Sequence, residues 1–356
     1  MKKIFSGLLV LSLLGSGLCL AADQETASQA TTNVSLDSIE EIWTANSQDL
    51  TKYQSTLTVS KSTYEDLVDD TEDMIDLAME GYYSTYNTLR NSRDEAEMGY
   101  EIAQLQYEQK IQTALLEAKK AFLTCWQDEL SVESTQESLT QKQSQLNGYA
   151  TLLQQGYISQ NQYDNLKQSV DNIQDTLDGL AIQQETDLIT LKVKLGLDTS
   201  GTVVLTYPEL TADDMEQLMK IDYSSDLETF MANSVDLKIL QITYDKKKEY
   251  HFSTKIERQD AALDLEMAKT SLPDSFKITY NSLMSQYSDL KTSYTSLSNQ
   301  KDSLDQTQTQ FALGVGTSMD YVDAGLSYVS AQAQVQEKEI SLYSTYLTYL
   351  NAVAGN

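Results

Sequence analysis

The sequence has very little proline, histidine or cysteine: 2 Pro, 1 His and 2 Cys occur among 356 residues. A many-stranded fold needs proline and glycine in its turns, and this chain has only those two prolines and 14 glycines. The composition therefore favours long helices. One histidine and two cysteines exclude most metal-site and nucleophilic-catalysis designs. No glycine loop suited to a phosphate is present either, so we expect neither an enzyme nor a cofactor.

Basic residues are also scarce, with 25 Lys and Arg against 53 Asp and Glu, and the formal net charge is −28. A surface this acidic repels the phosphates of nucleic acids and the headgroups of anionic lipids. We therefore expect no nucleic-acid partner. The chain is nevertheless 40% hydrophobic, which is enough to bury apolar surface along helix seams.

The N-terminus has the pattern of an export signal. Two lysines at 2–3 precede an apolar run at 4–20, and small residues at 21–22 come before a polar segment. The sequence therefore predicts a signal peptide at 1–22 and a flexible tether at 23–33. Export places the mature chain in the cell envelope, either in the outer membrane or in the periplasm or another extracytoplasmic space.

The two cysteines have different expected fates. Leu18 precedes Cys19 where a lipid-attachment site would have Gly or Ala, so we do not expect a lipid anchor at Cys19. Cys125 would be the single cysteine of the mature chain, which leaves no intramolecular disulfide. It lies on an apolar seam, so we interpret it as a core residue.

An internal duplication is the most informative feature of the chain. In the second half, apolar residues spaced by seven form a coiled-coil seam, namely Leu283, Leu290, Leu297, Leu304 and Phe311. Subtracting 158 from this region gives a matching seam in the first half, formed by Phe122, Cys125, Val132, Leu139, Leu146 and Leu153. Each seam is followed by a second heptad run of about 38 residues, which predicts a return helix of roughly 57 Å.

Matching turns connect each seam to its return helix. The segments LLQQGYISQNQYDNL (152–166) and QFALGVGTSMDYVDA (310–324) keep the same offset of 158. Glycine ends a helix at low cost because it readily adopts the left-handed conformation, and Ser or Thr caps the next helix. The predicted hairpin-turn residues are Gly156, Ser159, Gly314, Gly316 and Thr317.

The openings of the two halves also match. TANSQDL (44–50) corresponds to MANSVDL (231–237) at an offset of 187, so the first half carries about 29 extra residues before its seam. We therefore predict an all-α fold of two tandem long coiled-coil hairpins, at 34–198 and 199–356. The scarcity of proline permits uninterrupted helices of about 40 to 55 residues.

The junction between the halves holds the one strand-like piece of the sequence. TVVLT (202–206) alternates in the manner of a very short strand. Thr211 with Asp214 then has the spacing of a capping box, which predicts a short helix at 211–220.

Taken together, these motifs resemble the TolC-like outer-membrane efflux protein family. The matching pieces are the two ANSxDL openings, the two turns, the KLGLD ending (194–198) and the TVVLTYPEL link (202–210). In that family, two helical hairpins per chain and three chains form a tunnel across the periplasm, which a β-barrel continues in the outer membrane. The resemblance implies a TolC-like α-barrel protomer and a passive homotrimeric efflux conduit. Its implied partners are a periplasmic adaptor (membrane fusion) protein and an inner-membrane ABC or proton-driven pump.

The sequence departs from the family pattern where the barrel strands would lie. Residues 66–112 show helical seven-residue spacing, and residues 251–280 include a helix-favouring segment. Alternating strands of about ten residues are missing from both regions. The departure keeps open an alternative function as a non-conducting coiled-coil scaffold of the envelope, or as an accessory subunit of an exporter.

Acidic residues near the second turn form the candidate site. Family members narrow the channel tip with acids three residues apart, and Asp320 and Asp323 match that pattern on one helix face. In a trimer they would form rings of carboxylates that bind cations. The alternative interpretation is two acids placed near a helix start by the macrodipole. The family's tip arginine has no equivalent between Arg93 and Arg258, which argues against a salt-bridged gate.

Tyrosine is abundant, with 22 residues, many of them on the seams. A tyrosine stripe is compatible with a sugar- or drug-binding groove. The favoured interpretation is packing between helices, with the hydroxyl groups at the wet edge. His251 has no partner suited to acid–base chemistry.

Overall fold

The computed structural model describes residues 31–79 and 81–356, and the side chains of 76–80 are not described. The predicted signal peptide, Cys19 and the tether up to residue 30 lie outside this part of the chain. The described part contains two strands and nine helices, in the order β1 (Thr32–Ser35), α1 (Ile39–Asn46), α2 (Gln48–Met79), α3 (Tyr83–Gln154), α4 (Gln160–Lys194), β2 (Val203–Thr206), α5 (Ala212–Leu218), α6 (Tyr223–Asn233), α7 (Val235–Glu249), α8 (Lys255–Ala312) and α9 (Ser318–Val353).

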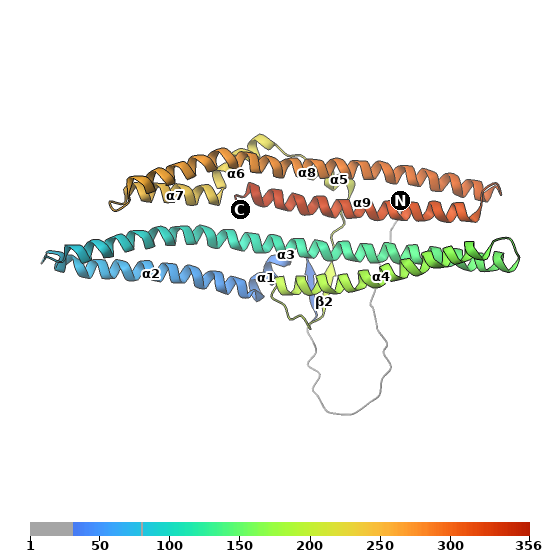
Figure 1. The fold of residues 1–356 in the computed structure, drawn as a ribbon, viewed down its shortest axis with the longest axis horizontal. Helices are drawn as coiled ribbons and strands as arrows, with labels where there is room; N and C mark the ends of the chain where they lie inside the picture. Colours follow the sequence, from blue (N-terminus) through green and yellow to red (C-terminus); the bar gives the residue numbers. More distant parts are fainter. Residues whose placement is uncertain (1–30, 80) are drawn as a thin grey trace, which may run out of the picture.

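The helices form two long hairpins that lie side by side (Figure 1), and the predicted all-α fold of tandem hairpins is confirmed. In the first half α3 packs against α4 at one end and against α2 at the other, and in the second half α8 packs likewise against α9 and α7. The α3–α4 and α8–α9 turns lie at the same end of the molecule (Figure 1). We call this end the tip.

The central helices are longer than the predicted 40 to 55 residues, since α3 has 72 residues and α8 has 58. The reason is that residues 83–112 of the first region belong to α3 and residues 255–280 of the second belong to α8. The return helices α4 and α9, with 35 and 36 residues, are close to the predicted length.

The two halves differ at the end opposite the tip. By the 158-residue offset Lys255, the first residue of α8, corresponds to Glu97, but α3 already begins at Tyr83. The α2–α3 hairpin therefore extends about 14 residues beyond the α7–α8 hairpin, or roughly 21 Å at 1.5 Å per residue. Figure 1 shows this overhang at the left. The extra residues of the first half are located here.

A two-stranded parallel sheet joins the start of the described chain to the link between the halves. The strand predicted within 202–206 is confirmed as β2, and it pairs with β1 from Thr32↔Val203 to Ser35↔Thr206. Thr32 and Asn33, which we predicted as the end of the tether, are thus part of a strand. The backbone N–H and C=O groups of β2 need a partner strand. The sequence of β1 is mostly polar, so it was not predicted to be that strand.

Two hydrophobic cores hold the hairpins together. The first buries Trp43, Phe122 and Cys125 between α1, α3 and α4. The second is built around Phe276, which packs against Phe230 and Tyr349. Burial and nearby acids raise the pKa of the Cys125 thiol to about 12. Cys125 is therefore a core residue, as its position on the seam predicted.

Each return helix closes on the opening motif of its own half. Gly196 and Gly355, just after α4 and α9, have φ of +70° and +92°. A Cβ atom on Gly196 would lie 2.4 Å from the carbonyl oxygen of Asn46, and one on Gly355 would lie 2.4 Å from that of Asn233. The two asparagines are the equivalent residues of the ANSxDL motifs. We call these contacts the glycine–asparagine corners. Sequence reasoning named both motifs but did not predict that they meet.

Candidate functional site: the hairpin tips

The glycines of the two turns have closely similar geometry. Gly156 and Gly314 follow the last turns of α3 and α8 with φ of 74° and 73°, in the left-handed region that glycine accepts at low cost. The residue after each glycine donates a backbone hydrogen bond to the end of the preceding helix. The Tyr157 N–H donates to the Leu152 carbonyl oxygen at 2.9 Å, and the Val315 N–H donates to the Gln310 carbonyl oxygen at 3.0 Å. Such bonds satisfy carbonyl groups that would otherwise lack partners.

Gly316 is required for a different reason. A Cβ atom on it would lie 3.0 Å from the Cβ of Gln310 and 3.1 Å from the backbone nitrogen of Phe311. The chain after α8 therefore folds back tightly on the helix, and this second glycine has no counterpart in the first turn.

Capping boxes start both return helices. Ser159 Oγ accepts from the N–H of Gln162 at 3.3 Å, and the Ser159 N–H donates to Gln162 Oε1 at 2.8 Å. At α9, Thr317 Oγ1 accepts from the Asp320 N–H at 3.1 Å and donates to Asp320 Oδ2 at 2.6 Å. The Asp320 carboxylate is thus engaged locally, and it remains exposed to solvent.

Asp323 has a partner on the other hairpin. Its Oδ1 lies 3.0 Å from Lys142 Nζ of α3, and this lysine also donates to Gln145 at 3.1 Å. The tip therefore has a cationic partner after all, although it is a lysine and not the arginine of the family pattern. The internal repeat did not mark this lysine as a partner, because the repeat equivalent of Lys142 is the neutral Gln300.

The structure keeps the two candidate acids on one helix but gives them separate partners. Asp320 belongs to the cap of α9, whereas Asp323 ties α9 to α3. Asp164, near the first turn, accepts from Gln160 at 2.9 Å within its own helix. Within one chain, Asp320 takes part in a helix cap and Asp323 in an ion pair, and the carboxylate rings of a trimer stay a prediction.

The turns also expose apolar side chains, which sequence reasoning missed. Tyr157 of the first turn and Leu313 and Val315 of the second are each more than 70% exposed. Phe311 and Tyr321 stack behind them with ring centroids 5.8 Å apart. The two turns thus place exposed apolar side chains at the tip.

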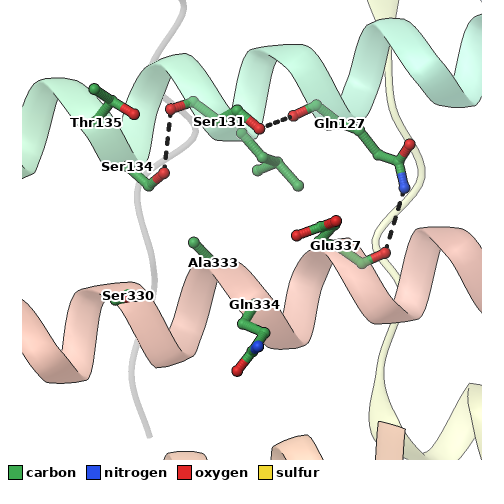
Figure 2. A pocket seen from close by; sticks show the side chains of 9 residues that line it. Gln127, Ser131, Ser134, Thr135, Ser330, Ala333, Gln334 and Glu337 are labelled. Carbon is green, nitrogen blue, oxygen red and sulfur yellow. Dashed lines mark hydrogen bonds between the residues drawn. The ribbon is translucent and has the colours of Figure 1, made fainter. Parts of the chain in front are cut away.

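Between the hairpins, Ile340, Tyr343 and Leu347 of α9 pack into the first core, whereas nearer the tip α3 and α9 meet through mostly small and polar side chains. A cleft of about 340 Å³ separates Ser131, Ser134 and Thr135 from Ser330 and Ala333, and Figure 2 shows the two helices facing each other across it. One hydrogen bond crosses the cleft directly, from Gln127 Nε2 to the Glu337 carbonyl oxygen at 3.4 Å. At this cleft, therefore, few contacts hold the two helices to each other.

The seam tyrosines pack in the way the favoured interpretation expects. Tyr349 is buried and donates to Asp226 at 2.7 Å, and Tyr294 donates to the buried carboxylate of Glu339 at 2.5 Å. Burial raises the pKa of Glu339 above its ordinary value. These hydroxyl groups hold helices together at the edges of the seams.

Across residues 31–79 and 81–356, no group of three or more His, Cys, Asp or Glu side chains is placed to hold a metal ion. The helices of these residues include none long and apolar enough to span a membrane.

One carboxyl group in the described part has a strongly shifted pKa. Burial, together with the neighbouring Asp187 of α4, raises the pKa of Asp128 on α3 to about 6. Its Oδ2 atom is buried without a hydrogen-bond partner. The folded chain therefore holds a proton on Asp128 more firmly than the unfolded chain does, and folding stability falls as the pH rises from about 4 to about 6.

We expect Asp128→Asn to stabilise the protein above pH 6, because it removes the disfavoured charge. A shift of this size corresponds to about 3 kcal/mol for a group shielded from water. Asp128 is only partly buried, so screening reduces the expected gain to about 1 kcal/mol. Urea unfolding at pH 7.5 and pH 4 measures the effect, with exposed Asp260→Asn as the control. A gain of the same size at both pH values would contradict this account.

No protein-family model and no curated protein matches the sequence. Solved structures do match along nearly the whole chain. CusC, whose structures concern transmembrane channel formation, aligns with a TM-score of 0.69 and 9% identity over 90% of this chain and 92% of its own. The outer membrane protein VceC from Vibrio cholerae aligns with a TM-score of 0.65 and 10% identity, over 90% of this chain and 96% of its own. The MtrE outer membrane channel from Neisseria gonorrhoeae aligns with a TM-score of 0.60 and 12% identity, over 90% of this chain and 89% of its own.

At these identities the likeness concerns the fold alone. It extends over 90% of the chain, and every one of these neighbours is an outer-membrane protein or a channel. The chain therefore has the TolC-like fold that its sequence motifs resemble.

Proposed function

We propose that this chain is the protomer of a passive, homotrimeric α-helical conduit for export through the cell envelope, with no enzymatic activity of its own. The observation that carries the proposal is the alignment of 90% of the chain with outer-membrane channel proteins, in spite of identities near 10%. Two tandem hairpins in each of three chains would supply twelve helices around one tunnel.

The tip surface supports a role for partner proteins. Tyr157, Leu313 and Val315 project from the turns as exposed apolar side chains, and a periplasmic adaptor that bridges to an inner-membrane ABC or proton-driven pump would cover them. Such a partner would hold the tip at the entrance of the tunnel and deliver substrate to it.

Opening of the tip would proceed by sliding of one hairpin along the other. The α3–α9 cleft has small side chains and one long hydrogen bond, so the movement breaks few contacts there. The Lys142–Asp323 ion pair joins the hairpins near the tip, and still nearer the tip the Tyr149 hydroxyl donates to Met319 Sδ at 3.1 Å. Once the ion pair breaks, Asp323 would join Asp320 in lining the mouth, and three chains would bring six carboxylates together as a cation-binding constriction.

Electron cryo-microscopy of the purified full chain in detergent tests the conduit. We expect a threefold particle of three 39.9 kDa chains around a continuous tunnel, with Asp320 and Asp323 near the axis at its narrow end. A stable monomer would contradict the proposal. A trimer whose centre is filled by side chains would identify the protein as a non-conducting scaffold, and carboxylates facing outward would remove the constriction but not the conduit.

A further inference from the structure

The two hairpins touch near the tip through a methionine. The Tyr149 hydroxyl of α3 donates to Met319 Sδ of α9 at 3.1 Å, and the two residues are 170 positions apart in the sequence. The contact lies between the Lys142–Asp323 ion pair and the turns. A thioether sulfur is a weak acceptor, so this hydrogen bond holds the hairpins together less firmly than a bond to an oxygen atom would.

Met319 is exposed to solvent as well as hydrogen-bonded. Its exposed fraction is 37%, whereas Met215 in the second core is fully buried and Met231 is half-buried. Met267 on α8 is more exposed, at 60%. Among the methionine side chains that the structure describes, only the Met319 sulfur accepts a hydrogen bond. A reaction at this sulfur therefore acts directly on a contact between the hairpins.

The first turn has no matching sulfur. By the 158-residue offset, Met319 corresponds to Asn161, and its partner Tyr149 corresponds to Thr307. Methionine and cysteine are the side chains that peroxides oxidise readily. The start of α4 therefore has no equivalent reactive group at this position, and the sulfur chemistry is confined to the start of α9.

Oxidation converts the thioether into a strong acceptor. Hydrogen peroxide transfers one oxygen atom to the sulfur: a sulfur lone pair forms the S–O bond, the O–O bond breaks, and water leaves. The sulfur loses two electrons, which the peroxide gains. The product, methionine sulfoxide, is polar, and its oxygen accepts hydrogen bonds. Because hydrogen peroxide is uncharged, the acidic surface of the chain does not repel it.

We propose that Met319 is a methionine sulfoxide site, at which a peroxide strengthens the contact between α3 and α9 and holds the tip closed. The Tyr149 hydroxyl already lies 3.1 Å from the sulfur, so a small side-chain rotation lets it donate to the new oxygen. The proposal rests on the proposed conduit, because a tighter contact affects transport only if the hairpins slide.

The carboxylates near Met319 do not compete for the Tyr149 hydroxyl. Asp320 Oδ2 accepts from Thr317 Oγ1 at 2.6 Å, within the cap of α9. Asp323 Oδ1 lies 3.0 Å from Lys142 Nζ. The hydroxyl therefore stays directed at residue 319, and the sulfoxide adds a second firm contact beside the ion pair.

Peptide mapping by mass spectrometry locates the modification after brief treatment of the full chain with dilute hydrogen peroxide. We expect the sulfoxide to form at Met319 faster than at the buried Met215 and the half-buried Met231. Hydrogen exchange of the backbone amides at the start of α9 then measures the contact, because a helix end held by a neighbour opens less often. We expect exchange there to slow by about fivefold on oxidation, the effect of one ordinary hydrogen bond.

Four variants separate this contact from oxidation elsewhere. Tyr149→Phe keeps the ring and loses the hydroxyl, so Met319 is still oxidised but exchange does not slow. Met319→Leu removes the response to peroxide, and Met267→Leu retains it. Met319→Gln supplies a permanent oxygen acceptor, so exchange is slow without peroxide.

Three results would overturn the inference: slower oxidation at Met319 than at Met231, unchanged or faster exchange in the oxidised chain, or equal slowing in Tyr149→Phe. None of them bears on the number of chains in the particle. A monomeric mass of the untreated chain by light scattering would instead contradict the conduit, while the peptide map and the exchange rates would still decide the sulfoxide contact.

Discussion

Gly196→Ala is expected to lower the free energy of unfolding by about 3 kcal/mol, a value at the upper end of single-substitution effects. Alanine is strained at the φ of +70°, and its Cβ would meet the Asn46 carbonyl oxygen at 2.4 Å. Backbone atoms on both sides make the clash hard to relieve. Urea unfolding of the full chain, followed by circular dichroism at a fixed protein concentration, measures the loss.

The repeat supplies an internal replicate of this experiment. Gly355→Ala places a Cβ atom against Asn233 in the same way, so a similar loss is expected. Gly148→Ala is the matched control, because this glycine lies within α3 and a Cβ atom added to it would have no neighbouring atom within 4 Å. Alanine has the higher helix propensity, and we expect a gain of up to about 1 kcal/mol there. Losses below about 1 kcal/mol at both corners would show that the glycine–asparagine contacts do not constrain the fold.

Phe276→Ala is expected to cost about 3–5 kcal/mol, the usual range for removing a buried phenylalanine. Phe276 is 1% exposed, and its ring stacks on Phe230 of α6 at 4.8 Å and packs against Tyr349 of α9 at 5.3 Å. The substitution leaves a cavity where three helices meet. The same urea unfolding assay measures this loss in the free energy of unfolding.

Two variants separate cavity formation from a general effect of losing an aromatic ring. Phe276→Leu retains most of the volume and should cost less than about 1.5 kcal/mol. Phe311→Ala removes a ring at the exposed tip, where surface substitutions change stability by about 0.5 kcal/mol or less. If Phe276→Ala and Phe311→Ala had equal effects, the second core would not be the main support of its hairpin.

The heptad pattern predicted the architecture because it records which face of each helix is buried. Leu283 and Leu290, on the predicted seam, are fully buried, and in the first half Cys125, the equivalent of Leu283, and Phe122 on the same seam are buried too. The lengths of α3 and α8 were harder to predict. The family resemblance places strands in the regions where the local spacing favours helix, and local spacing was the better guide.

Contacts between distant parts of the chain could not be predicted in the same way. Lys142 and Asp323 are 181 residues apart, and no local pattern links them. The glycine–asparagine corners likewise join motifs about 120 to 150 residues apart in sequence. Helical periodicity reports the buried face of a helix but does not identify the helix that covers it. At the candidate site, sequence reasoning therefore located the turns and the acids and missed the lysine and the exposed apolar side chains.

The overhang of the α2–α3 hairpin gives the two ends of the molecule different symmetry. At the tip, each chain presents two similar turns, so the trimer that we propose would carry six nearly equivalent positions, which six copies of a partner could occupy. At the opposite end the α7–α8 hairpin stops short by about 14 residues, so the proposed trimer would carry three projections there, one from each chain. A partner bound there would be matched to three copies per ring, and the ratio of bound partner to channel would differ between the two ends.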